Sequence, residues 1–183
     1  MLSQILETEL HRGLERVLID EETLRGRVSE LGREIGAHYG DCCPLLVGVL
    51  TGAFVFMADL ARAMGVPLRV DFMAVSSYGA GTTTSGAVRI LKDLDRAIEG
   101  EQLLVVEDII DSGLTLEYLM DGLRRRNPAD VRLVALLEKR KARRADVTPD
   151  WVGFEIPDEF VVGYGLDVAE RYRNLPFIAV ARA

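Results

Sequence analysis

The sequence of 183 residues contains little cysteine, and its two cysteines, Cys42 and Cys43, are adjacent. Neighbouring cysteines suit neither ordinary disulfide geometry nor the spaced ligand pairs of a zinc site. A disulfide scaffold and a structural zinc centre are therefore excluded. We expect two small, partly buried side chains at these positions.

Long apolar runs are also missing. No run approaches the roughly 18 residues that a membrane-spanning helix requires. Residues 1–16 carry acidic side chains where a signal peptide would have a basic start followed by an apolar stretch. We therefore expect a cytoplasmic protein without a membrane partner.

The sequence also lacks an excess of positive charge. The formal net charge of −7 argues against bulk attraction to nucleic acid or to an anionic membrane. The net charge does not exclude a local basic patch, and residues 123–144 form one such basic stretch in the sequence. The apolar share of 49% and the charged share of 28% are ordinary for a globular protein, and the length predicts one domain over residues 1–183.

One segment has the periodicity of an amphipathic helix. Asp20 suits the N-cap position, and apolar side chains then recur at steps of four, three and four residues, with charges between them. These side chains are Leu24, Val28, Leu31 and Ile35. The segment predicts a helix that packs one face on the core.

Short apolar runs alternate with helical patterns along the rest of the chain. The runs predicted as strands are residues 44–50, 68–78, 88–94, 101–108, 131–139, 160–167 and 176–182, and the helical patterns cover 53–64 and 116–123. Strands alternating with helices indicate an α/β domain, in which a mostly parallel twisted sheet is covered by helices on both faces. The Gly, Ser and Thr cluster of residues 79–87 has no periodicity and predicts a mobile loop.

The stretch LLVVEDIIDSGLTL, residues 103–116, places three carboxylates beside a buried strand. Glu107 and Asp108 stand at the carboxyl end of that strand, where open α/β sheets bind ligands. Adjacent carboxylates only accept hydrogen bonds, which suits a vicinal diol or a cation. The turn 111–115 offers backbone N–H groups, hydroxyls and a helix start, an arrangement that binds anions. Diol and phosphate together indicate a ribose 5-phosphate.

Each of these residues also has a purely structural interpretation, because Asp111 or Ser112 can cap the helix and the acidic pair can be a solvated strand end. The combination favours a site. The common nucleotide-binding motifs are absent: no Gly-x-x-x-x-Gly-Lys precedes Ser or Thr, and Thr84 replaces the third glycine of Gly-x-Gly-x-x-Gly. A P-loop NTPase and a Rossmann dehydrogenase are therefore excluded by motif.

The stretch VVEDIIDSGLTL resembles the phosphoribosyl-pyrophosphate motif of the type I phosphoribosyltransferases, specifically their hypoxanthine-guanine branch. Further segments follow in the order that family has them: residues 48–60, 71–79, 88–94, 136–140 and 150–177. The resemblance implies the type I fold with a small hood for the purine. It also implies purine salvage, in which phosphoribosyl passes from 5-phosphoribosyl 1-pyrophosphate to hypoxanthine or guanine, giving IMP or GMP and pyrophosphate.

The resemblance also implies roles for the ribosyl half of the site. Glu107 and Asp108 would hold the ribose hydroxyls, and Asp111 would be the acid/base group near purine N7. The loop for the 5-phosphate would comprise Asp111, Ser112, Gly113, Leu114 and Thr115. Magnesium is the implied cofactor, because the pyrophosphate leaving group is highly charged and the chain is acidic. Its ligands would be Glu107, Asp108 and Asp167.

For the purine half, the likeness makes Lys139 the donor to the 6-oxo group, which would favour 6-oxopurines over adenine. Phe160 would lie over the base, Val161 would meet its edge through main-chain groups, and Asp167 would lie near magnesium on the pyrophosphate side. On sequence alone, Lys139 is equally one lysine of a basic surface run, and Phe160 and Val161 are core residues.

The pyrophosphate residues implied by the likeness are Thr51, Gly52 and Arg173. Many family members carry Lys where Thr51 stands, so backbone N–H donors would have to serve here. Ser77 and Tyr78 would open the loop that closes over the site and excludes water.

Two alternatives remain open at this point. A regulator of the same fold would bind nucleic acid through its basic stretch, but it need not keep Asp111, Lys139 and the 159–167 segment together. Xanthine-preferring transfer is a second possibility. The family resemblance also implies a homo-oligomer, either a dimer or a tetramer. It implies small molecules as the substrates.

Overall fold

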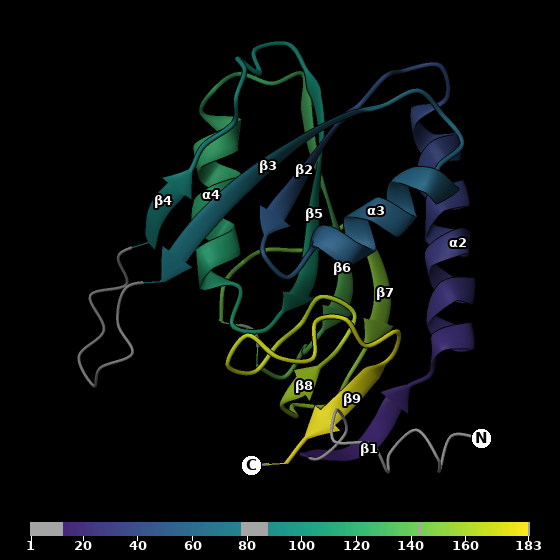
Figure 1. Ribbon diagram of the computed structural model, residues 1–183. Coiled ribbons are helices and arrows are strands. Elements are labelled where there is room, and N and C mark those ends of the chain that lie inside the picture. Colours follow the sequence, from purple (N-terminus) through teal and green to yellow (C-terminus); the bar gives the residue numbers. More distant parts are fainter. Residues whose placement is uncertain (1–12, 78–87, 143, 183) are drawn as a thin grey trace.

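The computed structural model describes residues 13–77, 88–142 and 144–182. Its centre is a six-stranded sheet with the order β4-β3-β2-β5-β6-β7 (Figure 1). The strands are β2 (Leu45–Leu50), β3 (Arg69–Ser77), β4 (Val88–Lys92), β5 (Gln102–Ile110), β6 (Asp130–Glu138) and β7 (Trp151–Glu155). All neighbours in this sheet pair in parallel except β3 and β4, which pair antiparallel. The predicted α/β class and mostly parallel sheet are confirmed.

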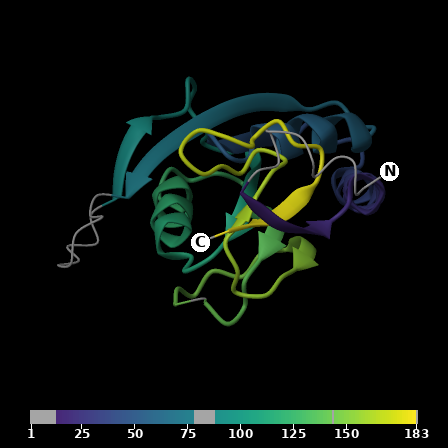
Figure 2. The ribbon, with the colours of Figure 1, turned by 60° about the horizontal axis from the view of Figure 1, so that its bottom comes forward.

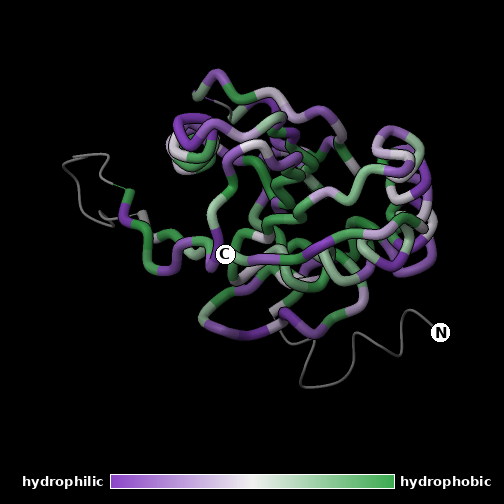
Figure 3. The backbone as a smooth tube through the Cα atoms, turned by 90° about the horizontal axis from the view of Figure 1, so that it is seen from above, coloured by the Kyte–Doolittle hydropathy of each residue, from purple (hydrophilic) through white to green (hydrophobic). Residues whose placement is uncertain are grey.

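Helices cover both faces of this sheet, as predicted. Helices α2 (Glu21–Tyr39) and α3 (Phe54–Ala63) lie on one side, and α4 (Leu114–Arg124) lies on the other (Figure 1). Side chains alternate between the two faces of a strand, so the adjacent residues Leu103 and Leu104 of β5 belong to opposite cores. Figure 3 shows the hydrophobic residues gathered in the central strands and the hydrophilic ones over the outer turns.

The N-terminus of α2 agrees with its sequence signal. Oδ1 of Asp20 accepts a hydrogen bond from the N–H of Thr23 at 2.8 Å, which satisfies one of the free N–H groups of the first turn. The predicted inward residues Leu24, Val28 and Leu31 are all buried. Within the described ranges, no helix is long and apolar enough to cross a membrane.

A second, smaller sheet has the antiparallel order β1-β9-β8 and lies across the carboxyl end of the main sheet (Figure 2). Its strands are β1 (Leu14–Ile19), β8 (Val161–Val162) and β9 (Ile178–Ala181). Residues 160–167 were predicted as one strand, but only two of them form one, because Gly163, Tyr164 and Gly165 all have positive φ. This sheet is the small hood implied by the family resemblance.

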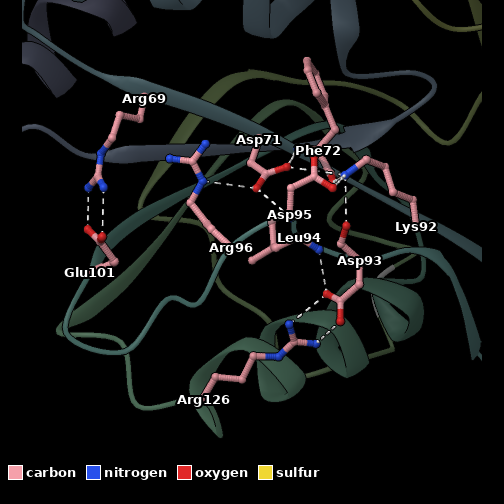
Figure 4. A network of polar contacts seen from close by, with 10 residues as sticks. All are labelled: Arg69, Asp71, Phe72, Lys92, Asp93, Leu94, Asp95, Arg96, Glu101 and Arg126. Carbon is pink, nitrogen blue, oxygen red and sulfur yellow. Dashed lines mark hydrogen bonds and ion pairs between the residues drawn. The ribbon is translucent and has the colours of Figure 1, made fainter.

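The two arms of the β3–β4 hairpin are joined near their base by a buried carboxylate (Figure 4). Asp71 in β3 accepts hydrogen bonds from the N–H of Phe72 at 2.8 Å and of Asp95 at 3.0 Å, and its Oδ1 lies 3.5 Å from Nζ of Lys92. Arg96 approaches its other oxygen at 3.6 Å. Residues 79–87, predicted as a mobile loop, lie outside the described residues.

The expectation of two partly buried cysteines is wrong. Cys42 and Cys43 are exposed rather than partly buried, because they lie in the turn between α2 and β2 and burial begins only at Pro44. Trp151 starts the edge strand β7, where it is partly buried against the hydrophobic core and contacts the ring of His38 edge-on, with 5.2 Å between the ring centroids.

Candidate active site

A cavity of about 290 Å³ opens at the carboxyl ends of β2, β5 and β6, beneath the small sheet. Its lining residues come from loops that are far apart in the sequence. They are Thr51, Gly52, Asp108, Ile109, Asp111, Lys139, Phe160, Val161, Leu166, Asp167 and Arg173. All of them except Ile109 and Leu166 were predicted as site residues.

The acidic pair lies near the carboxyl end of β5, which continues to Ile110. Oε2 of Glu107 is buried, and no hydrogen-bond partner is found for it among the described residues. Oδ1 of Asp108 accepts the N–H of Ile109 at 2.8 Å. Burial raises the pKa of Glu107 well above its ordinary value, and the neighbouring Asp108 raises it further. Burial also raises the pKa of Asp108, to about 6. Two carboxyl groups that are costly to ionise in the free protein suit a cation or hydroxyl donors.

The Thr51–Gly52 loop packs against this pair. A Cβ atom on Gly52 would overlap Oδ2 of Asp108, and a Cβ atom on Gly165 would overlap the carbonyl oxygen of Gly52. The peptide bond between Leu50 and Thr51 is cis. Glycine at position 52 is therefore required for the close approach of the loop to Asp108.

The predicted phosphate loop runs from Asp111 into the start of α4. Gly113 is the N-cap residue with φ of +79°, a conformation that glycine adopts without steric cost. The carbonyl of Ser112 accepts the N–H groups of Arg144 at 2.9 Å and Ala145 at 3.1 Å, which fixes the loop from behind. The first N–H groups of α4 have no partner within the helix, so this end can accept an anion.

Lys139 follows β6 and lies between two carboxylates. Its Nζ is 3.2 Å from Oδ2 of Asp111 and 3.4 Å from Oδ1 of Asp158. Lys139 is 7% exposed, so it is not a lysine of the exposed basic run. Asp158 was not predicted as a site residue, because an acidic residue in a loop gives no local signal of its partner.

On the hood side, Arg173 lines the cavity beside Asp167. Its Nη2 pairs with Oδ1 of Asp167 at 2.8 Å, and its Nη1 donates to the carbonyl of Gly165 at 2.8 Å. Phe160 is 57% exposed at the cavity wall, whereas Val161 is buried. The interpretation of Phe160 as a core residue is therefore wrong, and its ring is free to meet a ligand.

Some predicted residues do not line the cavity. Glu107 and the residues from Ser112 to Thr115 are not among its lining residues, although Glu107 directly precedes the lining residue Asp108 and Ser112 directly follows the lining residue Asp111. Ser77 ends β3, and Tyr78 lies outside the described residues.

One hydrogen bond between the hood and α3 was not predicted. The hydroxyl of Tyr164 donates to Oδ2 of Asp59 at 2.6 Å and joins the hood to α3. A side-chain hydrogen bond between residues so far apart in the chain leaves no pattern in the local sequence.

Comparison with known families agrees with this geometry. The model of the phosphoribosyl transferase domain matches residues 23–169. The chain therefore belongs to the phosphoribosyl transferase family, in the branch of the hypoxanthine-guanine phosphoribosyltransferases. Such an enzyme from Bacillus subtilis strain 168 is 54% identical over 169 residues, which cover 92% of this chain and 94% of that protein. One from Mycobacterium avium is 52% identical over 177 residues, which cover 93% and 87%.

Solved structures show the same relationship. A hypoxanthine phosphoribosyltransferase from Staphylococcus aureus superposes with a TM-score of 0.91 at 42% identity, covering 97% of this chain and 96% of that one. A hypoxanthine-guanine phosphoribosyltransferase from Bacillus anthracis, with a HEPES molecule in its active site, has a TM-score of 0.87 at 47% identity, covering 92% and 99%. The type I fold implied by the sequence is confirmed.

Proposed function

We propose that this chain transfers phosphoribosyl from 5-phosphoribosyl 1-pyrophosphate to hypoxanthine or guanine, giving IMP or GMP and pyrophosphate. The observation that carries the proposal is a single cavity lined by the carboxylates of Asp108 and Asp111, a nearly buried lysine and an exposed aromatic ring. Glu107 and the N-terminus of α4 adjoin these lining residues in the chain. The names of the relatives support the same reaction.

The ribosyl end would be held by the end of β5 and the start of α4. Glu107 and Asp108 would accept hydrogen bonds from the ribose hydroxyls, since carboxylates are pure acceptors. The loop from Asp111 to Thr115 would bind the 5-phosphate through the N–H groups and positive end of α4.

The purine base would be recognised by Lys139, Phe160 and Val161. Lys139 would donate to the 6-oxo group, and adenine, with an amino donor at that position, would be rejected. The ring of Phe160 would stack on the base, and main-chain groups of Val161 would meet its edge. Asp111 would take the proton from N7 as N9 bonds to the sugar.

The pyrophosphate would lie against Thr51, Gly52 and Arg173. Backbone N–H groups of the Thr51–Gly52 loop would donate to it, and the Arg173 guanidinium would balance its charge.

Magnesium fits the donors present, because carboxylate oxygens are its preferred protein ligands and Oε2 of Glu107 is buried with no hydrogen-bond partner in the described part of the chain. Glu107, Asp108 and Asp167 would hold it. When bound, magnesium would stabilise negative charge on the pyrophosphate leaving group. Among the described residues, no three His, Cys, Asp or Glu side chains gather closely enough to hold a metal ion by themselves. Substrate oxygens and water would therefore complete its coordination shell.

The regulator alternative is less well supported, because several cations of the basic stretch are already paired. Arg140 lies 3.5 Å from Glu138 and 3.3 Å from Glu155. Arg126 forms a bidentate pair with Asp93 at 2.8 and 2.9 Å. These pairs reduce the positive charge that a nucleic acid would meet.

The family resemblance also suggests a homo-oligomer, a dimer or a tetramer. A mostly apolar cavity of about 460 Å³ beside α2 and α3, with Phe54 42% exposed at its wall, is consistent with a covered surface. Sedimentation velocity of the full chain would give the oligomeric state.

Steady-state assays with hypoxanthine, guanine, xanthine and adenine, each with the sugar pyrophosphate and magnesium, test the proposed reaction. We expect turnover with hypoxanthine and guanine and little with adenine. A preference for xanthine would change the substrate but keep the reaction class. No transfer to any 6-oxopurine would contradict the proposal.

A further inference from the structure

Asp158 is the second carboxylate at the ammonium group of Lys139. It lies in the loop between β7 and β8, two residues before Phe160, and its Oδ1 is 3.4 Å from Nζ. The first carboxylate, Asp111, is 3.2 Å from the same atom. The lysine side chain is 8% exposed, whereas those of Asp111 and Asp158 are 57% and 65% exposed. The cation is thus nearly buried and is paired with two carboxylates that come from different loops, one after β5 and one between β7 and β8.

The proposed reaction changes the charge of only one of these carboxylates. As the bond between N9 and the sugar forms and the bond to pyrophosphate breaks, the proton on N7 passes to the carboxylate of Asp111. Asp111 then becomes neutral, and Lys139 loses one of its two negative partners. A buried ammonium group without a charged partner is costly. Asp158 takes no part in the proton transfer, so it keeps its negative charge.

We propose that Asp158 is a positioning residue that holds the Lys139 ammonium group at the purine 6-position while Asp111 is neutralised. The proposal rests on the proposed function. Without Asp158, Lys139 keeps Asp111 as its single charged partner among the described residues, and this pairing would draw the ammonium group toward the N7 side of the base. Recognition of the 6-oxo group would then weaken, although Asp158 itself need not touch the purine.

The next residue in the chain provides a matched control. Glu159 carries the same charge on the same loop, but its side chain pairs with Arg16 of β1, at 2.6 Å between Oε2 and Nη2. Asp158→Asn and Glu159→Gln therefore remove the same charge from neighbouring positions, and only the first change removes a partner of Lys139.

The experiment is a double-mutant cycle of Asp158→Asn and Lys139→Gln, measured by steady-state kinetics with hypoxanthine and adenine. We expect Asp158→Asn to lower kcat/KM for hypoxanthine by about three- to tenfold, the effect of a partly exposed ion pair. The KM for the sugar pyrophosphate should stay unchanged, and the preference for hypoxanthine over adenine should fall. In the Lys139→Gln background, Asp158→Asn should have almost no further effect.

Equal losses for Asp158→Asn with and without Lys139, or an equal loss for Glu159→Gln, would overturn the role of Asp158. A thermal-unfolding cycle of the same variants tests the ion pair without any assay of activity. The effects of Asp158→Asn and Lys139→Gln on the stability of the free protein should be non-additive. Additive effects would also overturn the proposal. A wild-type protein that transfers to no 6-oxopurine would instead overturn the proposed function, and with it the catalytic part of this role.

Discussion

Lys139 and Asp111 form an ion pair across the cavity, with Nζ 3.2 Å from Oδ2. The pair joins the end of β6 to the loop after β5, two strands that are neighbours in the main sheet. The residue proposed to recognise the purine 6-position therefore already contacts the residue proposed to take the N7 proton. The two atoms of the purine that these side chains would address are neighbours as well, so one base can engage both.

Replacing Lys139 by Gln should weaken purine binding far more than binding of the sugar pyrophosphate. A hydrogen bond from a charged group contributes about 1.5–3 kcal/mol, so the KM for hypoxanthine should rise by roughly ten- to a hundredfold. Lys141→Gln, an exposed lysine of the same stretch, is the control. Equal effects of Lys139→Gln on both substrates would rule out the role in base recognition.

The double change Glu107→Gln and Asp108→Asn should weaken binding of the sugar pyrophosphate in the presence of magnesium. Amides are poorer partners than carboxylates for hydroxyl groups and for a divalent cation. Titration calorimetry would measure the affinity, with Glu99→Gln and Asp121→Asn at exposed positions as the control of equal charge change. Unchanged affinity would leave the acidic pair as a strand terminus.

The raised pKa of Asp108 predicts a pH-dependent stability. Burial raises this pKa from an ordinary 3.8 to about 6, so between these values the folded protein binds more protons than the unfolded chain. The contribution of Asp108 to the free energy of unfolding is therefore fully present below pH 3.8 and is lost as the pH rises through about 6. Relative to Asp108→Asn, the wild type should lose stability across this window. Parallel pH profiles of the two proteins in denaturant unfolding would contradict the assignment.

Gly52→Ala should disturb the pyrophosphate loop, because the added methyl group would overlap Oδ2 of Asp108. We expect a loss of stability of about 1–3 kcal/mol and a higher KM for the sugar pyrophosphate. Gly122→Ala is a suitable contrast, since it lies within α4 with open space around its Cβ position. That change should stabilise the protein by about 0.5–1 kcal/mol. Wild-type kinetics in Gly52→Ala would show that the loop tolerates a side chain.

The main sheet was predictable because its central strands are buried on both faces. Such strands appear in the sequence as continuous apolar runs, and β2, β5 and β6 were identified in this way. Edge strands lack this signal. β7, with partly buried residues, was not expected as a strand, and β1 forms only because it pairs with β9 at the other end of the chain.

The residues of the candidate site also differ in how well the sequence predicts them. Residues in one short segment, such as Glu107, Asp108 and Asp111, are recognisable because the carboxylates and the small-residue turn are adjacent in the sequence. Asp158 and the hydrogen bond between Tyr164 and Asp59 were missed, because each depends on a contact between distant segments. Burial of Lys139 and exposure of Phe160 also follow from the packing of the hood, which no local pattern encodes.

The central claim is that the loop after β5 is catalytic, and the turnover number of Asp111→Asn with hypoxanthine tests it most directly. Asn keeps the shape of the side chain but cannot exchange the N7 proton, so kcat should fall by about 10² to 10⁴. Affinity for the sugar pyrophosphate should stay the same or improve slightly, because a negative charge has left the phosphate loop. Asp121→Asn, an exposed carboxylate of α4, should leave both quantities unchanged. A nearly normal kcat together with a collapse of that affinity would show that Asp111 is a structural residue of the loop and would contradict the account.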